Sequence, residues 1–290
     1  MLTIFTTPKD FTGEFDFIQR NALCSWRAIS EDIEIIVIGD SLGAKEAAEL
    51  YSAEYIKDVE TSPQGIPTIS GLFETAEKRA DNNLLCYVNA DIILPKIFLD
   101  TISILIGKRR RFMAVGHRWD LDVVESIDFE DNMVFSKFWE DAYNKAKKHA
   151  CTGIDYFIFK KGTFKNILDL AIGRFGWDNW LLWKARRMRI PLIDMSDGIF
   201  AIHQDHSYSF NKFNNKSDIL MSDDGKNNQI KTDEQMLNLL DANYHLVNGK
   251  IEKKRSRDFI NRNLAKLPII FPEFSLPLII YKKLYRKYLL

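Results

Sequence analysis

Short, almost uninterrupted apolar runs recur along the first 205 residues, and a stretch with helical spacing follows most of them. Residues 33–38 read IEIIVI and residues 84–88 read LLCYV. Runs this apolar are typical of strands that are buried on both faces, as in parallel sheets covered by crossover helices. The alternation of strands and helices therefore predicts an α/β domain with an open, mostly parallel sheet flanked by helices.

The individual elements follow from apolar periodicity and from turn residues. We expect strands over residues 2–6, 33–38, 84–88, 112–116, 155–159, 190–195 and 199–203. We expect helices over residues 15–29, 44–51, 67–80, 95–106, 135–149 and 178–188.

Composition changes after this alternating region. Residues 207–235 are crowded with Asn, Lys, Asp and Ser, which predicts a mobile loop, either a lid over a site or a plain disordered loop. Residues 250–290 form a basic tail around the apolar stretch LPIIFPEFSLPLIIY. We divide the chain into a domain over 1–210 and an extension over 211–290, which combines the loop with a helical, basic and apolar C-terminal tail.

Such a tail has three possible roles: it rests on an anionic membrane surface, packs on the domain, or binds a second subunit. The 40 basic and 40 acidic residues balance, and the basic clusters lie in the tail rather than around the expected cleft. We therefore expect no nucleic-acid partner. The three scattered cysteines match no metal or redox spacing, and no signal peptide or long apolar span is evident. The expected location is cytoplasmic, at the inner face of the membrane if the tail binds there.

Polar residues follow several of the predicted strands. Asp40, Asp91 and Arg118 each come just after one. Because open α/β sheets bind ligands beyond the carboxyl ends of their strands, these side chains are expected to converge on one cleft. A carboxylate there, such as Asp91 in Asn89-Ala90-Asp91, suits a divalent cation that neutralises a diphosphate. The alternative for Asp91 is a cap on the helix that follows.

Five motifs carry a resemblance to a known family. YVNADIIL resembles the Asp-x-Asp region of GT-A glycosyltransferases, although Asn89 stands where the family has its first Asp. Together with GHRWDLDV, GIDYFIF, GWDNWL and AIHQDH, in this order over residues 1 to about 210, it resembles a family 2-like group of bacterial glycosyltransferases of the surface-polysaccharide type. The resemblance implies a nucleotide-diphospho-sugar transferase fold, a nucleotide-sugar donor, a glycan or lipid-linked acceptor, and Mn²⁺ or Mg²⁺.

The resemblance also implies roles for individual residues. His203 takes the place of a late histidine that ligates the metal beside Asp91, and its imidazole favours Mn²⁺ over Mg²⁺; Asp205 and His206 are weaker candidates, and a structural histidine is the alternative. The donor-binding candidates are Thr6, Thr7, Pro8, Arg20, Asp40, Asn89, Ala90, Asp91 and Arg118. The acceptor-binding candidates are Trp119, Asp120, Asp122, Asp155, Trp177 and Asn179.

Asp178 resembles the catalytic or acceptor-binding acid of related GT-A enzymes. An inverting transfer needs a base near the acceptor hydroxyl, and a carboxylate among aromatic residues at a helix start meets that need. If the enzyme retains the anomeric configuration, Asp178 would orient the acceptor instead. The alternative is that Asp178 caps the helix while Trp177 lies in the core.

Two other functions compete with a metal-dependent glycosyltransferase of cell-surface polysaccharide biosynthesis. A nucleotidyltransferase shares the sheet and the carboxylates, but it usually has a glycine-rich, basic loop after the first strand, whereas TTPKDFTGEF holds a single glycine. A non-catalytic carbohydrate-binding relative keeps the fold without the chemistry, and Asn89 favours this interpretation.

Overall fold

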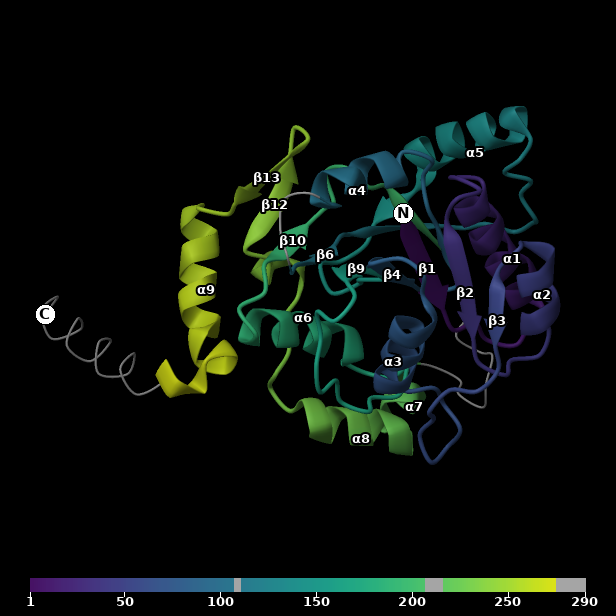
Figure 1. Cartoon of the computed structure of the whole chain (residues 1–290). Helices are drawn as coiled ribbons and strands as arrows, with labels where there is room; N and C mark the ends of the chain where they lie inside the picture. Colours follow the sequence, from purple (N-terminus) through teal and green to yellow (C-terminus); the bar gives the residue numbers. More distant parts are fainter. Residues whose placement is uncertain (107–110, 207–215, 275–290) are drawn as a thin grey trace, which may run out of the picture.

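The computed structural model describes residues 1–106, 111–206 and 216–274 (Figure 1). The strands are β1 (Leu2–Thr6), β2 (Glu34–Ile38), β3 (Glu54–Ile56), β4 (Leu84–Val88), β5 (Ile92–Ile93), β6 (Met113–Val115), β7 (Arg118–Leu121), β8 (Lys147–Lys148), β9 (Tyr156–Lys160), β10 (Leu192–Asp194), β11 (Ala201–Gln204), β12 (Tyr244–Val247) and β13 (Lys250–Lys253). The helices are α1 (Glu14–Arg27), α2 (Ala44–Leu50), α3 (Ile69–Arg79), α4 (Phe98–Ile106), α5 (Asn132–Lys145), α6 (Trp177–Arg187), α7 (Lys216–Met221), α8 (Asp223–Thr232) and α9 (Arg257–Ile270), with 3-10 turns at Leu239–Asp241 and Pro272–Phe274.

A large sheet forms the centre of the molecule (Figure 1). Within the described residues it has nine strands in the order β13-β12-β10-β6-β9-β4-β1-β2-β3. Neighbouring strands are parallel except where β9 pairs with β4 and β6 and where β13 pairs with β12. The predicted α/β class, with an open and mostly parallel sheet flanked by helices, is confirmed.

The central strands are apolar on both faces because helices cover both. On β4, Leu84, Cys86 and Val88 pack in one core with α1, α2 and α4, whereas Leu85 and Tyr87 pack in a second core with α3 and α6. Successive side chains of a strand point to opposite faces, so a strand between two cores has to be apolar throughout. This packing explains the uninterrupted apolar runs of the sequence.

The chain order reverses beside β1. β2 and β3 lie on one side of β1, and β4 lies on the other side, parallel to it. Such a reversal opens a crevice at the carboxyl ends of the strands, where ligands of open α/β sheets bind. Thr7, Asp40 and Asn89 follow β1, β2 and β4 at this crevice, each within two residues of the strand end.

A second, smaller sheet lies next to this crevice. Among the described residues its order is β5-β11-β7-β8. Only residues 89–91 separate β4 from β5, and β5 pairs antiparallel with β11, so that Ile92 lies opposite His203. The second sheet therefore brings residues near position 203 to the end of β4.

The prediction of a loop over residues 207–235 was wrong for residues 216–232, which form α7 and α8. The Ser222 hydroxyl caps α8 by accepting from the Gly225 amide. The buried Asn228 side chain accepts from the Ala171 amide at 2.9 Å and donates to the Ala171 carbonyl at 3.0 Å. The polar residues of α8 thus form hydrogen bonds that hold this helix against the rest of the domain. Residues 207–215 lie outside the described part of the chain.

The helix expected over residues 135–149 is shifted toward the N-terminus. α5 starts at Asn132 because the Asp131 carboxylate accepts from the amides of Met133 and Val134. It ends at Lys145, and the following lysines form β8 against β7. The remaining predicted strands and helices occur with ends shifted by a few residues at most.

The part assigned to the extension also contributes to the main sheet. β12 pairs with β10, β13 extends the sheet to its edge, and α9 follows. Of the predicted helical tail, α9 is described, and residues 275–290 lie outside the described part. None of the helices in the described part is long and apolar enough to cross a lipid bilayer.

Candidate functional site

A cavity of about 830 Å³ opens at the reversal of the strand order. Its walls come from segments that follow β1, β2 and β4, from the start of β7 and α6, and from β11. Ten of the predicted site residues line it: Thr7, Pro8, Asp40, Asn89, Ala90, Asp91, Arg118, Asp155, Trp177 and His203.

The other predicted donor-binding residues lie away from this surface. Thr6 is buried in β1 and is 1% exposed. The Arg20 guanidinium pairs with Asp16 at 2.8 Å on α1. Neither residue is among those that line the cavity.

Four predicted acceptor-binding residues are likewise outside the cavity wall. Trp119 packs on Phe200, with ring centroids 4.9 Å apart. Asp122 is exposed beyond the end of β7. The Asn179 amide donates to the Leu237 carbonyl at 2.8 Å. Asp120 lies behind the cavity wall, beside His203.

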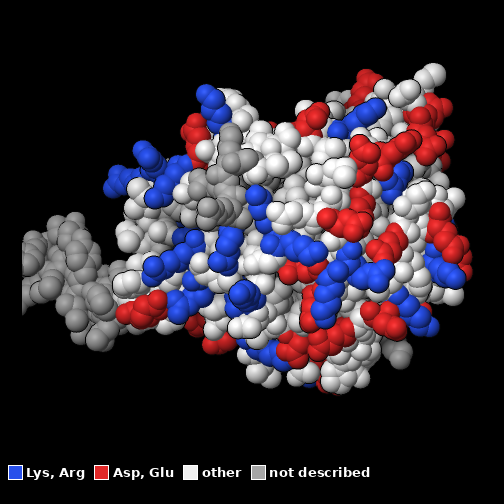
Figure 2. Space-filling model, viewed as in Figure 1, with Lys and Arg blue, Asp and Glu red and all other residues white. Residues whose placement is uncertain are grey.

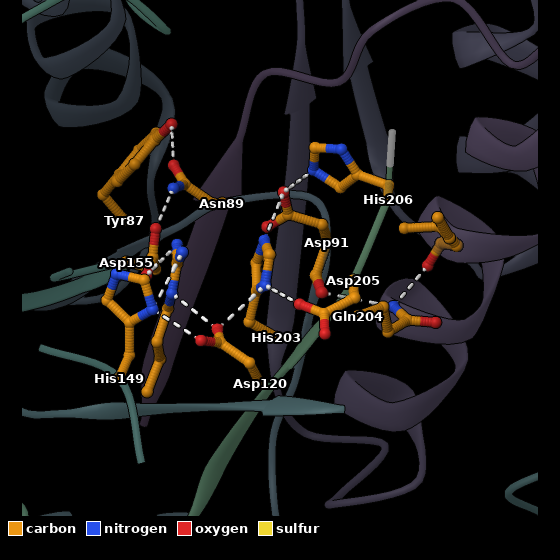
Figure 3. A network of polar contacts seen from close by, with 12 residues as sticks. Tyr87, Asn89, Asp91, Asp120, His149, Asp155, His203, Gln204, Asp205 and His206 are labelled. Carbon is orange, nitrogen blue, oxygen red and sulfur yellow. Dashed lines mark hydrogen bonds and ion pairs between the residues drawn. The ribbon is translucent and has the colours of Figure 1, made fainter. Parts of the chain in front are cut away.

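The centre of the site is the carboxylate of Asp91 (Figure 3). Its Oδ2 lies 3.6 Å from His203 Nε2 and 3.3 Å from His206 Nε2. Its Oδ1 is buried and has no hydrogen-bond partner among the described residues. Burial by itself raises the pKa of Asp91, but the neighbouring histidines outweigh it and hold the pKa below its usual value.

This group of side chains suits a divalent cation. One ligand atom from each of Asp91, His203 and His206 lies within 4.8 Å of the others. A carboxylate with two imidazoles favours a transition metal such as Mn²⁺ over Mg²⁺, which prefers oxygen ligands. The buried Asp91 Oδ1, which lacks a donor, supplies a further ligand atom, so the residues present fit a bound cation.

A buried amide holds the backbone of Asp91 in place. The Gln204 side chain donates to the Ile18 carbonyl at 2.8 Å and to the Asp91 carbonyl at 3.2 Å. Its oxygen accepts from Asn21 at 3.0 Å. Because buried amides have to be paired, this arrangement links α1, β11 and the segment after β4.

Asn89 belongs to a second network in the cavity wall (Figure 3). Its Oδ1 accepts from the Tyr87 hydroxyl at 2.8 Å, and its Nδ2 donates to Asp155 Oδ1 at 2.6 Å. The other oxygen of Asp155 accepts from Arg118 at 3.0 Å. Asn89 therefore supplies a donor that Asp155 needs, and a carboxylate at position 89 would have no proton to offer at neutral pH.

Arg118 joins this network to the metal side of the cavity. Burial lowers the pKa of Arg118, but Asp155, Asp91 and Asp120 more than compensate and raise it. Its Nε lies 3.1 Å from Asp120 Oδ1. The guanidinium is thus engaged by carboxylates and is less suited to clamp a phosphate than the sequence suggested.

Asp178 lies in the first turn of α6, directly after Trp177 in the cavity wall. Gly176, not Asp178, is the N-cap residue of α6, but Asp178 Oδ1 accepts from the Asn179 amide at 2.8 Å, and Trp177 lies in the core as the capping alternative expected. Burial raises the pKa of Asp178 to about 7, and the Asp155 carboxylate adds to this, while the Asn179 amide opposes it. Asp178 does not itself line the cavity.

Three cationic residues in the cavity wall were not among the predicted site residues: Lys9, Lys57 and Arg174. Lys57 pairs with Asp40 at 3.1 Å. The Lys9 backbone is fixed by the buried Gln19 side chain, which accepts from its amide at 2.7 Å and donates to its carbonyl at 3.0 Å. The Lys9 ammonium lies 4.0 Å from the centre of the Phe15 ring. The sequence did offer one signal for Lys9: it directly follows Thr7 and Pro8, which were predicted to bind the donor.

A scan against models of protein families finds no match for this chain, and a search of curated proteins finds none. Solved structures do show similarity. A structure of TarS 1-349 from S. aureus matches at 13% identity with a TM-score of 0.34, over 43% of this chain and 37% of that one. This chain thus spans under two fifths of that relative.

Two further matches cover more of the chain. Glucosyl-3-phosphoglycerate synthase from Mycobacterium tuberculosis, in complex with Mn²⁺, uridine-diphosphate and glucosyl-3-phosphoglycerate, matches at 10% identity and a TM-score of 0.48, over 88% of this chain and 87% of that one. The mannosyltransferase PcManGT from Pyrobaculum calidifontis, in complex with GDP-Man and Mn²⁺, matches at 13% identity and a TM-score of 0.46, over 72% and 58%.

The network around Asn89 predicts that Asn89→Asp destabilises the protein. The new carboxylate would face Asp155 and lose the hydrogen bond that Asn89 donates, at an expected cost of about 1–3 kcal/mol in the free energy of unfolding. Urea unfolding at pH 7 measures this. The deficit should shrink as the pH falls, because the introduced carboxyl group regains a donor when it is protonated. Asn132→Asp at the exposed start of α5 is the control; equal stability of the two variants would contradict the prediction.

Proposed function

We propose that this chain is a GT-A type, metal-dependent glycosyltransferase that moves a sugar from a nucleotide-sugar donor to a glycan or lipid-linked acceptor in cell-surface polysaccharide biosynthesis. The observation that carries the proposal is the partly buried Asp91 carboxylate, which meets His203 and His206 at a cavity where the strand order of the sheet reverses.

The size and charge of the cavity support a nucleotide-sugar donor. Its volume of about 830 Å³ lies within the range of small-molecule sites. Lys9 and Arg174 line the same cavity as Asp91. Two cationic side chains beside a cation site complement a diphosphate, which carries two negative charges.

The cation would be held by Asp91, His203 and His206, and when bound it would act as a Lewis acid on the diphosphate oxygens. Lys9 and Arg174 would bind the same oxygens directly and orient the donor. In the transfer, the acceptor oxygen forms a bond to the anomeric carbon while the bond from that carbon to the phosphate oxygen breaks.

Asp178 is proposed to take the proton of the acceptor hydroxyl. A general base works best when its pKa lies near the operating pH, and the pKa of about 7 meets this condition. Trp177, which directly precedes it, lines the cavity, although it is only 5% exposed and packs against Tyr87 and Phe157. If the configuration is retained, Asp178 orients the acceptor instead.

A non-catalytic carbohydrate-binding relative is the second candidate. The observation that favours it is that both polar atoms of the Asn89 side chain are used by Tyr87 and Asp155. In this case the cavity binds a sugar without transferring it. Release of sugar from a donor in the presence of Mn²⁺ separates the two candidates.

The proposal includes peripheral contact with the inner face of an anionic membrane through the C-terminal extension. Figure 2 shows Lys and Arg side chains gathered over β13 and the start of α9. Lys253 and Arg255 are exposed there, and Ile260 and Leu264, one helical turn apart on α9, are 49% and 47% exposed. Basic side chains next to apolar ones suit an interface with anionic lipid.

Asp91→Ala is expected to weaken Mn²⁺ binding by more than about 100-fold, beyond the range typical of outer-sphere partners, because it removes the central ligand. Isothermal titration calorimetry with Mn²⁺ alone measures this. Asp81→Ala, at the other end of β4 and exposed, is the matched control and should bind like the wild type. Unchanged affinity in Asp91→Ala would remove Asp91 from the metal site.

The raised pKa of Asp178 predicts a pH profile. The carboxyl is protonated and inactive as a base below about pH 7, so kcat/KM should rise with pH through about 7 and then level off. Asp178→Asn should keep donor binding, lose transfer by roughly 10²–10⁴-fold, and abolish this limb of the profile. The donor is first chosen by a thermal-shift screen of nucleotide sugars with Mn²⁺. Asp169→Asn, at an exposed site, should leave the profile unchanged; full activity in Asp178→Asn excludes the base role.

Membrane contact predicts that the full chain sediments with phosphatidylglycerol vesicles and not with phosphatidylcholine vesicles. Lys253→Glu with Arg255→Glu should weaken this binding at least about 10-fold, because each basic residue near an anionic surface contributes about 1 kcal/mol. Lys165→Glu with Lys226→Glu, at exposed sites elsewhere, is the control for net charge. Equal sedimentation of the two double variants would exclude the β13–α9 surface.

A further inference from the structure

Asp120 lies beside the candidate metal ligand His203 rather than in the cavity. β7 and β11 are parallel neighbours, and their register places Asp120 opposite His203. Asp120 Oδ1 is 3.2 Å from His203 Nδ1, the imidazole nitrogen remote from Asp91 (Figure 3). Both atoms are buried and have no hydrogen-bond partner of standard geometry among the described residues. Of the two carboxylates that approach His203 Nδ1, Asp120 is thus the nearer, since Asp205 Oδ1 lies 3.5 Å away.

The carboxylate of Asp120 is itself held from its other side. Its Oδ2 lies 2.5 Å from His149 Nδ1, and Arg118 Nε lies 3.1 Å from its Oδ1. His149 in turn packs so closely on Gly153 that a side chain there would collide with its ring. Asp120 therefore has little freedom to turn away from His203.

We propose that Asp120 is a positioning residue, which keeps the proton of His203 on Nδ1 and thereby leaves the Nε2 lone pair directed at Asp91 to bind a cation. The inference rests on the proposed metal site. A carboxylate behind an imidazole stabilises the Nδ1–H tautomer and raises the basicity of Nε2. Nε2 and Asp91 Oδ2, 3.6 Å apart, are then both acceptors, and a cation between them satisfies both.

The strand geometry supports this role over the acceptor-binding role that the sequence suggested. Arg118 and Asp120 alternate along β7 with Trp119 and Leu121, which pack against the core around Ile202. Side chains two apart on a strand share a face, so Arg118 and Asp120 both point toward His203 and Asp155. Asp120 does not line the cavity, so it could act on a bound substrate only through Arg118, His203 or Asp155, which do line it.

Asp205 is the competing partner of the same nitrogen. Its Oδ1 lies 3.5 Å from His203 Nδ1, but its side chain is 54% exposed, compared with 22% for Asp120. Water screens and competes for an exposed carboxylate more effectively than for a buried one. Asp120 is therefore the dominant partner, and the two residues can be compared directly.

The first experiment measures Mn²⁺ affinity by calorimetry on the full chain without nucleotide. Asp120→Ala should weaken binding by about 10–100-fold, the effect typical of a carboxylate that supports a metal-bound histidine. Asp120→Asn should restore most of this affinity, because its amide oxygen still accepts from Nδ1–H. Asp205→Ala should change affinity less than about 3-fold, and Glu125→Ala, exposed in the segment after β7, should match the wild type.

The second experiment reads the tautomer directly. Nitrogen-15 NMR of the wild-type imidazoles, assigned with His203→Gln, should show the proton on Nδ1 of His203 before Mn²⁺ is added. A proton on Nε2 would overturn the proposal, whatever the folding of the Asp120 variants. Equal Mn²⁺ affinity of the wild type and Asp120→Ala would also overturn it. Absence of Mn²⁺ binding by the wild type would instead overturn the metal site on which the proposed function depends.

Discussion

The pairing of β5 with β11 is the interaction on which the site depends. It brings Ile92, just after Asp91, opposite His203, although 111 positions of sequence separate the two. The buried Gln204 amide secures the same junction by binding the Asp91 carbonyl. Without this small sheet, the carboxylate at the end of β4 would have no histidine beside it. The large sheet thus forms the crevice, and the small sheet places the histidine of the candidate metal site beside it.

Much of the fold was predictable because its central strands lie between two cores. A strand such as β4 has to be apolar on both faces, and that requirement is visible in five consecutive residues. The short strands β5, β8 and β13 carry no such signal, since each has few residues and polar or mixed neighbours. α8 was missed because its polar residues, such as Asn228, form hydrogen bonds with another segment that a local pattern does not reveal.

The candidate site shows the same division. Residues directly after strands, such as Asp40 and Asp91, were predictable because the sheet topology gathers strand ends. The residues that each of these side chains contacts were not predictable. Asn89 pairs with Asp155, 66 positions away, and Asp120 lies opposite His203 because of the register of β7 and β11. Register is a property of tertiary pairing, so the sequence offered Asp120 only as one acid in a charged segment.

The β12–β13 hairpin has a consequence for solubility of the folded chain. β13 forms one margin of the nine-stranded sheet, where backbone groups on its outer side have no neighbouring strand within the described residues. Such a margin is a template for pairing with another molecule. The sequence of β13 is KIEK, with Lys250, Glu252 and Lys253 exposed. Two strands of this kind would bring like charges together, so the margin discourages growth of the sheet from one molecule to the next.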